Sequence, residues 1–252
     1  MLNALLELPG GLPTLAILAA AAFAGSLVFG LTGFGAALIT IPLATHFVPL
    51  PFALALFSLM DLANAARVGA ENPRNAVRAE WMRLIPMIVV GTAIGVTLLV
   101  NLPRKAGMLA LGTFVIVYAL WSLAKPGGSG RIAAGWAWLA GLAGGLTSTL
   151  FGAGGPPYVI YLSQRGLSKE ALRATLGFAT LSSISLRVAA FLISGLLLDL
   201  TVWLCALAVL PAAWLGLGLA RRMYLRVSRE ALLRAMALVL LASGAGLIVR
   251  GL

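Results

Sequence analysis

Charged residues are scarce in this sequence, and acidic ones are the scarcest. Only 10% of the 252 residues are charged, with 7 Asp and Glu against 18 Lys and Arg. A soluble domain normally has about a quarter charged residues, so this composition excludes an ordinary soluble fold. The single cysteine, Cys205, excludes an intramolecular disulfide framework. No phosphate-binding loop, metal cluster or nucleophile–base set is visible, so we expect no cofactor and no enzymatic activity.

Apolar residues dominate what is present. The chain is 61% hydrophobic, with a mean hydropathy of +1.04. This predicts an all-α, polytopic protein of the cell (inner) membrane, with the lipid bilayer as its surroundings. The net charge of +11 fits Lys and Arg gathered in cytoplasmic loops, and we expect no nucleic-acid partner.

The apolar blocks form two similar series. They lie at 12–47, 50–70, 84–102, 105–124, 133–164, 170–197, 200–220 and 231–250. The first and fifth blocks are too long for one simple span, and glycines interrupt both. An offset of 119 residues aligns Gly33 with Gly152 and Gly35 with Gly154. We therefore predict an internal duplication, with repeat 1 at 1–124, a Gly/Pro-rich linker at 125–131 and repeat 2 at 132–252.

The two interruptions read "GLTGFGAALITIPL" (30–43) and "TLFGAGGPPYVIYL" (149–162). A break in a membrane helix leaves backbone N–H groups at the start of the second half-helix, where the helix dipole favours an anion. Prolines lack this donor but suit the first turn of a new helix. The predicted substrate-binding residues at the breaks are Thr32, Gly33, Phe34, Gly35 and Ala36 in repeat 1, and Gly152, Ala153, Gly154, Gly155 and Pro156 in repeat 2.

Polar residues inside two other spans indicate the same site. Asp61 and Asn64 share a helix face in repeat 1, and Thr180, Ser183 and Arg187 share one in repeat 2. Ionisable residues at membrane depth are costly, which makes them functional candidates. Arg187 is expected to bind an anion, with Asn64, Thr180 and Ser183 as polar contacts. For Asp61, a coupling proton and an ion pair with an arginine both remain open.

Charge distribution predicts the topology. If each long broken block is a hairpin that returns to the side it entered, fourteen Lys and Arg residues fall on one side and three on the other. The positive-inside rule then makes the rich side cytoplasmic and puts both termini outside. Each half would contain one hairpin and three spans, so the repeats would be inverted. Kinked full spans are the alternative.

The two quoted motifs, in two halves of a membrane protein of this length, resemble the TauE/SafE (sulfite exporter) family. The resemblance covers nearly the whole chain, and the second Gly-Gly-Pro motif is its most specific part. Ala36 and Ala37 depart from the family pattern, where glycine is commoner. The family implies export, or sometimes uptake, of sulfite, organosulfonates or related small anions, so we expect this protein to be an exporter.

The residues themselves indicate a secondary transporter that binds a small anion between the breaks and works by alternating access. An anion channel and a non-transporting membrane accessory subunit are the alternatives.

Overall fold

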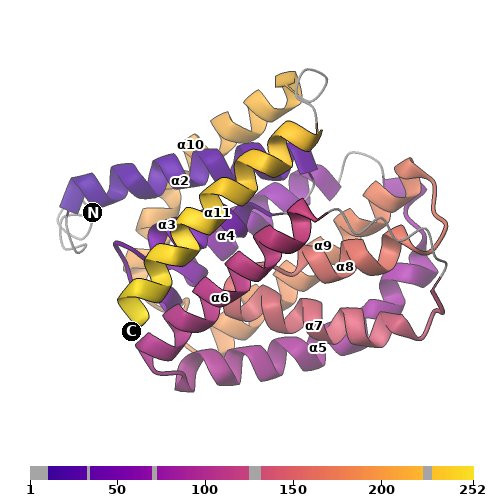
Figure 1. The fold of residues 1–252 in the computed structure, drawn as a ribbon, viewed down its shortest axis with the longest axis horizontal. Coiled ribbons are helices and arrows are strands. Elements are labelled where there is room, and N and C mark those ends of the chain that lie inside the picture. The colour runs from indigo at the N-terminus through magenta and orange to yellow at the C-terminus, as the bar shows by residue number, and fades with distance from the viewer. Residues whose placement is uncertain (1–10, 33–34, 70–72, 125–131, 224–228) are drawn as a thin grey trace.

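The computed structural model describes residues 11–32, 35–69, 73–124, 132–223 and 229–252, and within these ranges it contains helices but no β-strand. The predicted all-α fold is confirmed (Figure 1). The helices are α2 (Gly11–Thr32), α3 (Ala36–Ala44), α4 (Leu50–Gly69), α5 (Arg78–Asn101), α6 (Arg104–Leu123), α7 (Trp136–Phe151), α8 (Gly155–Ser163), α9 (Lys169–Ile193), α10 (Leu200–Met223) and α11 (Arg229–Gly251), with a 3-10 turn at Pro73–Asn75 before α5.

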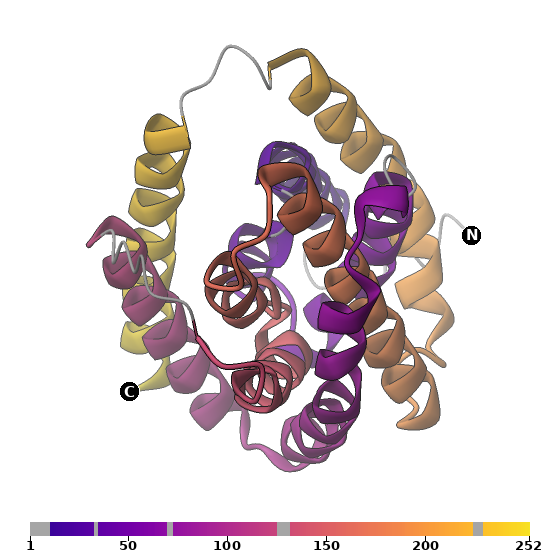
Figure 2. The same ribbon diagram turned by 90° about the vertical axis from the view of Figure 1, so that its right-hand side faces the viewer.

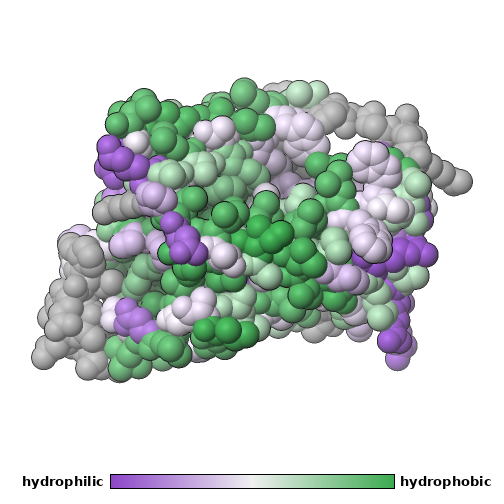
Figure 3. Space-filling view, turned by 90° about the horizontal axis from the view of Figure 1, so that it is seen from below, coloured by the Kyte–Doolittle hydropathy of each residue, from purple (hydrophilic) through white to green (hydrophobic). Residues whose placement is uncertain are grey.

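Several helices are long and apolar enough to cross a membrane. Within the described residues these are α2, α4, α5, α9 and α10, and shorter apolar stretches lie in α6 and α11. On the face seen in Figure 3, hydrophobic residues fill the broad middle and hydrophilic residues lie towards the two ends. Such a band is what a bilayer requires of a protein surface.

Two helix ends differ from their predicted positions for local reasons. The span predicted at 84–102 begins earlier, at Arg78, because the polar segment before the apolar run is also helical. The span predicted at 170–197 ends at Ile193, and Gly195 follows with a φ of 85°, a backbone conformation that glycine adopts easily. At the start of α9 the Ser168 hydroxyl accepts a hydrogen bond of 3.1 Å from the Ala171 N–H and caps the helix.

The two long apolar blocks are broken at the glycines that the sequence singled out. In the first block Gly35 precedes α3 with a φ of 89°. In the second block Gly152 follows α7 with a φ of 71°. The Gly152 N–H donates to the Ser148 carbonyl at 2.9 Å, so α7 ends in an ordinary left-handed cap. Prolines then occupy the first turn of α8, where they lose no helical hydrogen bond.

The second half-helix of each block runs back along the first. At the base of the second block, the Ile132 N–H donates to the Gln164 carbonyl at 3.3 Å. Midway along it, Gly144 of α7 has no room for a Cβ because the Tyr158 ring of α8 lies against it. In the first block, Gly25 of α2 lies against Thr40 of α3 in the same way. Both blocks are therefore helical hairpins in this structure.

The two halves of the chain pack reciprocally. Helix α5 packs along α7, and α10 packs along α2; α4 packs against α9, and α6 against α11. Figure 2 shows α6 and α11 side by side, away from α10. Small residues permit the closest approaches: Gly145 of α7 lies on the Ile88 backbone, and Gly216 of α10 lies on the Phe23 backbone. The hairpins are thereby held by helices from the opposite half.

Candidate functional site

A small cavity of about 20 Å³ lies between the two helix breaks. That volume holds little more than one water molecule. The cavity is lined by Phe29, Gly35, Ala36, Ala37, Asp61, Ser148, Gly152, Gly154, Gly155, Tyr158, Thr180, Ser183 and Ile184. Residues from both halves of the chain therefore meet at this cavity.

The cavity lies at the N-termini of two half-helices. Gly35, Ala36 and Ala37 begin α3, and Gly154 and Gly155 begin α8. A helix start presents backbone N–H groups and the positive end of the helix dipole. These groups converge because the breaks are adjacent: a Cβ added to Gly152 would collide with the Ala37 side chain.

Two of the predicted backbone donors are already occupied. The Gly152 N–H bonds to the Ser148 carbonyl, and the Ala153 N–H bonds to the Thr147 carbonyl at 3.1 Å. Both bonds cap α7, because a helix end leaves carbonyls that need donors. Within the described chain, no hydrogen bond engages the N–H groups of Gly154 and Gly155. The available donors thus lie at the start of α8 and not across the whole motif.

Asp61 and Arg187 form a buried ion pair beside the cavity. Arg187 Nη2 donates to Asp61 Oδ2 at 2.8 Å, and the side chains are 1% and 6% exposed for Arg187 and Asp61, respectively. Arg187 Nη1 donates to the Ser148 carbonyl at 2.8 Å, next to the break in α7. Its Nε has no partner within the described residues. The sequence left two roles open for Asp61, a coupling proton and an ion pair with an arginine. The structure shows the ion pair.

Hydroxyl groups complete the wall of the cavity. The Tyr158 hydroxyl donates to Ser183 Oγ at 2.9 Å. The Thr180 hydroxyl is buried and has no partner in the described part of the chain. Tyr158 and Ser148 were not predicted from the sequence. The signal that could have found them is their position: Ser148 lies one helical turn before the break at Gly152, and Tyr158 directly follows the double proline.

The remaining predicted residues lie near the cavity or outside the residues that the structure describes. Gly33 and Phe34 lie outside the described residues. Ala153 and Pro156 are buried beside the break but do not line the cavity. The Thr32 hydroxyl donates to the Val28 carbonyl within α2. Asn64 does not line the cavity either; its Nδ2 donates to Ser26 Oγ at 2.8 Å, which joins α4 to α2.

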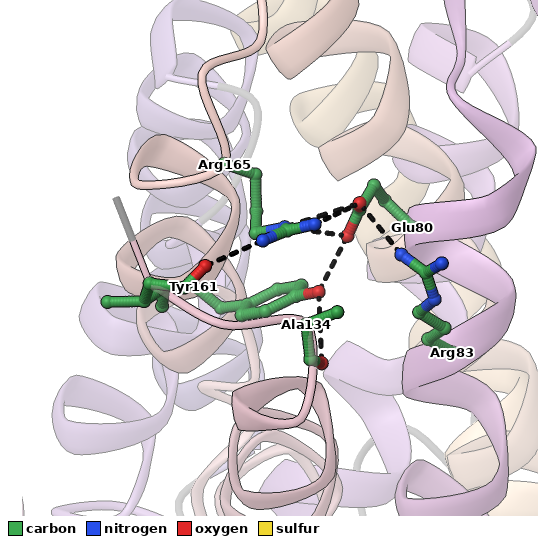
Figure 4. A network of polar contacts seen from close by, with 6 residues as sticks. Glu80, Arg83, Ala134, Tyr161 and Arg165 are labelled. Carbon is green, nitrogen blue, oxygen red and sulfur yellow. Dashed lines mark hydrogen bonds and ion pairs between the residues drawn. The ribbon is translucent and has the colours of Figure 1, made fainter. Parts of the chain in front are cut away.

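A charged network closes the base of the second hairpin (Figure 4). Glu80 of α5 accepts hydrogen bonds from Tyr161 Oη at 2.6 Å and from Arg165 Nη2 at 3.0 Å. It also pairs with Arg83 at 3.0 Å. Arg165 Nη1 donates to the Ile132 carbonyl at 2.6 Å, and hydrogen bonding to Glu80 raises the pKa of Arg165. The network ties both arms of the α7–α8 hairpin to a helix of the first half.

An all-helical protein with membrane-length helices, and with a polar cavity at two helix breaks in its interior, has the architecture of a membrane transporter. Residues 17–247 match the family described as "Sulfite exporter TauE/SafE". Because this match covers most of the chain, the protein belongs to the TauE/SafE family of membrane transporters.

A curated relative supports the membership. The chain is 27% identical over 194 residues to the "Probable inner membrane transporter protein TsaS" of Comamonas testosteroni. The alignment covers 76% of this chain and 81% of the relative. No solved structure matches the chain.

Proposed function

We propose that this protein is a secondary transporter of small anions of the sulfite and organosulfonate class. The observation that carries the proposal is the cavity between the N-termini of α3 and α8. Two helix dipoles and unengaged N–H groups favour negative charge there. A sulfonate or sulfite group offers three oxygens to such donors and to the unpartnered Thr180 hydroxyl. The name of the family points to the same chemistry.

The size of the cavity and the packing of the halves support alternating access as the mechanism. A space of about 20 Å³ is too small for a sulfonate, so the hairpins must separate for the substrate to enter. The reciprocal contacts of α5 with α7 and of α10 with α2 support an inverted duplication of 1–124 and 132–252. Rocking one half against the other would expose the cavity to each side in turn.

The proposed orientation places both termini outside the cytoplasm. Loops between the helices would then carry most of the Lys and Arg residues on the cytoplasmic side of the inner membrane. The foot of the α7–α8 hairpin, with Arg165 and Lys169, would face the cytoplasm. The foot of the α2–α3 hairpin, at His46 and Phe47, would face outwards.

Counterflow in proteoliposomes tests the function. Vesicles loaded with unlabelled sulfite or methanesulfonate should accumulate the labelled anion from outside, with saturation. An anion channel would give flux without saturation or counterflow. A non-transporting accessory subunit would give no anion flux, and either outcome would contradict the proposal.

A further inference from the structure

We propose that each anion this transporter binds is accompanied by one proton, and that the proton is carried by Asp61. The inference rests on the proposed function and adds the coupling ion.

Asp61 is one of the residues that line the cavity, and the Arg187 guanidinium lies next to the lining residue Gly152. Arg187 is held in place by Asp61 and by the Ser148 carbonyl, both at 2.8 Å. An anion in the cavity would therefore lie close to the negative charge of Asp61. The ion pair is neutral as a whole, so it gives the cavity no net positive charge to attract a substrate.

Protonation of Asp61 changes both the charge that the anion meets and the net charge of the ion pair. The carboxyl group becomes neutral and ceases to repel the anion, and the positive charge of Arg187 loses its counter-ion. The anion then replaces the carboxylate as the partner of Arg187, whose Nε already lacks a hydrogen bond within the described residues. A buried arginine is strongly stabilised by such a partner, because an unpaired buried charge is costly. Anion and proton thus bind together, and each favours the other.

Few other ionisable groups surround Asp61. Among the helices that pack on α4, helices α2, α3 and α7 carry no ionisable side chain. Helix α9 contributes Arg187 and α8 contributes Tyr158, whose hydroxyl is bonded to Ser183. Arg67, at the end of α4, is exposed. No ionisable residue of α6 or α10 that the structure describes lines the cavity, which leaves Asp61 as its sole carboxylate.

The transport cycle balances in charge. Asp61 takes a proton from water on the side where the anion enters and returns it on the side where the anion leaves, and no bond in the substrate changes. For a monoanion the translocated complex carries no net charge. A pH gradient should therefore drive transport, and the membrane potential should not.

Calorimetry of the purified full chain with methanesulfonate tests the linkage. Methanesulfonate keeps its charge at all working pH values, so any pH dependence belongs to the protein. Titrations in buffers of different ionisation enthalpy should show uptake of about one proton per anion bound. Where Asp61 is ionised, the affinity should fall about tenfold for each pH unit between about pH 6 and about pH 8.

Substitutions assign the proton to Asp61. Asp61→Asn should bind methanesulfonate with a pH-independent affinity and without proton uptake. Asp61→Glu retains a titratable group and should retain the uptake. Asp199→Asn, at an exposed carboxylate outside the site, is the matched control and should behave as the unmodified protein.

The outcomes separate the two proposals. Saturable methanesulfonate counterflow with pH-independent binding and no proton uptake would overturn the coupling and leave the proposed function standing. Proton uptake that persists in Asp61→Asn would also overturn it. If Asp61→Asn does not fold, Asp61→Glu carries the test, and loss of proton uptake in a folded Asp61→Glu variant would overturn the coupling. Absence of any methanesulfonate flux would contradict the proposed function itself.

Discussion

Asp61 and Arg187 are 126 residues apart in the chain, yet their side chains meet at 2.8 Å in the interior. One belongs to α4 and the other to α9, the two helices that pack together between the hairpins. The pair brings two buried, opposite charges together beside one small cavity. Its stability and the binding of an anion are therefore expected to depend on each other.

Loss of one partner should cost more than loss of both. Arg187→Ala leaves a buried, unpaired carboxylate, and we expect the free energy of unfolding to fall by about 3–5 kcal/mol. The double variant Asp61→Asn/Arg187→Gln should recover most of that stability but still lack anion counterflow. Thermal unfolding and counterflow in parallel check this. Normal counterflow in the double variant would remove Arg187 from the site.

Gly152→Ala should destabilise the second break. The φ of 71° is unfavourable for alanine, and its methyl group would overlap Ala37 across the cavity. We expect a loss of about 1–3 kcal/mol and impaired transport. Gly218→Ala is the matched control, because nothing lies within 4 Å of its added Cβ in α10, and it should be neutral or stabilise by about 0.5–1 kcal/mol. Equal thermal midpoints for the two variants would contradict this account.

Glu80→Gln should loosen the base of the α7–α8 hairpin. The substitution removes the charge that Arg165 and Arg83 share, and bonds to charged groups contribute about 1.5–3 kcal/mol. Thermal unfolding of the purified protein measures the loss. Glu170→Gln, at an exposed carboxylate in α9, is the control. A loss no greater than in the control would show that the network contributes nothing to stability.

Protonation of His46 should destabilise the folded state. Burial of the imidazole, with the nearby charge of Arg250, lowers the pKa of His46 below its ordinary value. The unfolded chain therefore binds a proton more readily than the folded protein, and stability falls as pH drops below about 6.5. His46→Gln should reduce the fall in thermal midpoint between about pH 7.5 and about pH 5. If the thermal midpoint of His46→Gln falls as much as that of the unmodified protein, other groups cause the fall.

The two hairpin feet should be accessible from opposite sides of the membrane. With the buried Cys205 replaced by alanine, Phe47→Cys should react with an impermeant maleimide added outside. Lys169→Cys should react only after the membrane is opened. Both replaced side chains are exposed, so a failure to react would not be due to burial of the cysteine. Labelling of both from the same side would contradict the proposed inverted arrangement.

Much of the fold was determined by the sequence itself. The lengths of the apolar runs predict membrane helices, because the thickness of the bilayer core sets how many apolar residues a spanning helix needs. The glycines of the two motifs predicted both breaks, because residues such as Gly35 and Gly152 permit a φ that others resist. Polar residues inside apolar helices, such as Asp61 and Arg187, were candidates for a site because their burial is costly.

Only the tertiary structure decided which of these groups meet. The sequence left Asp61 with two roles, and packing of α4 on α9 gave it Arg187 as its partner. Helix capping consumed the N–H groups of Gly152 and Ala153, which a motif alone does not reveal. Tyr158 reached the cavity because α8 folds back along α7. Helical periodicity specifies which residues share a face, but the neighbour of that face depends on contacts between distant segments of the chain.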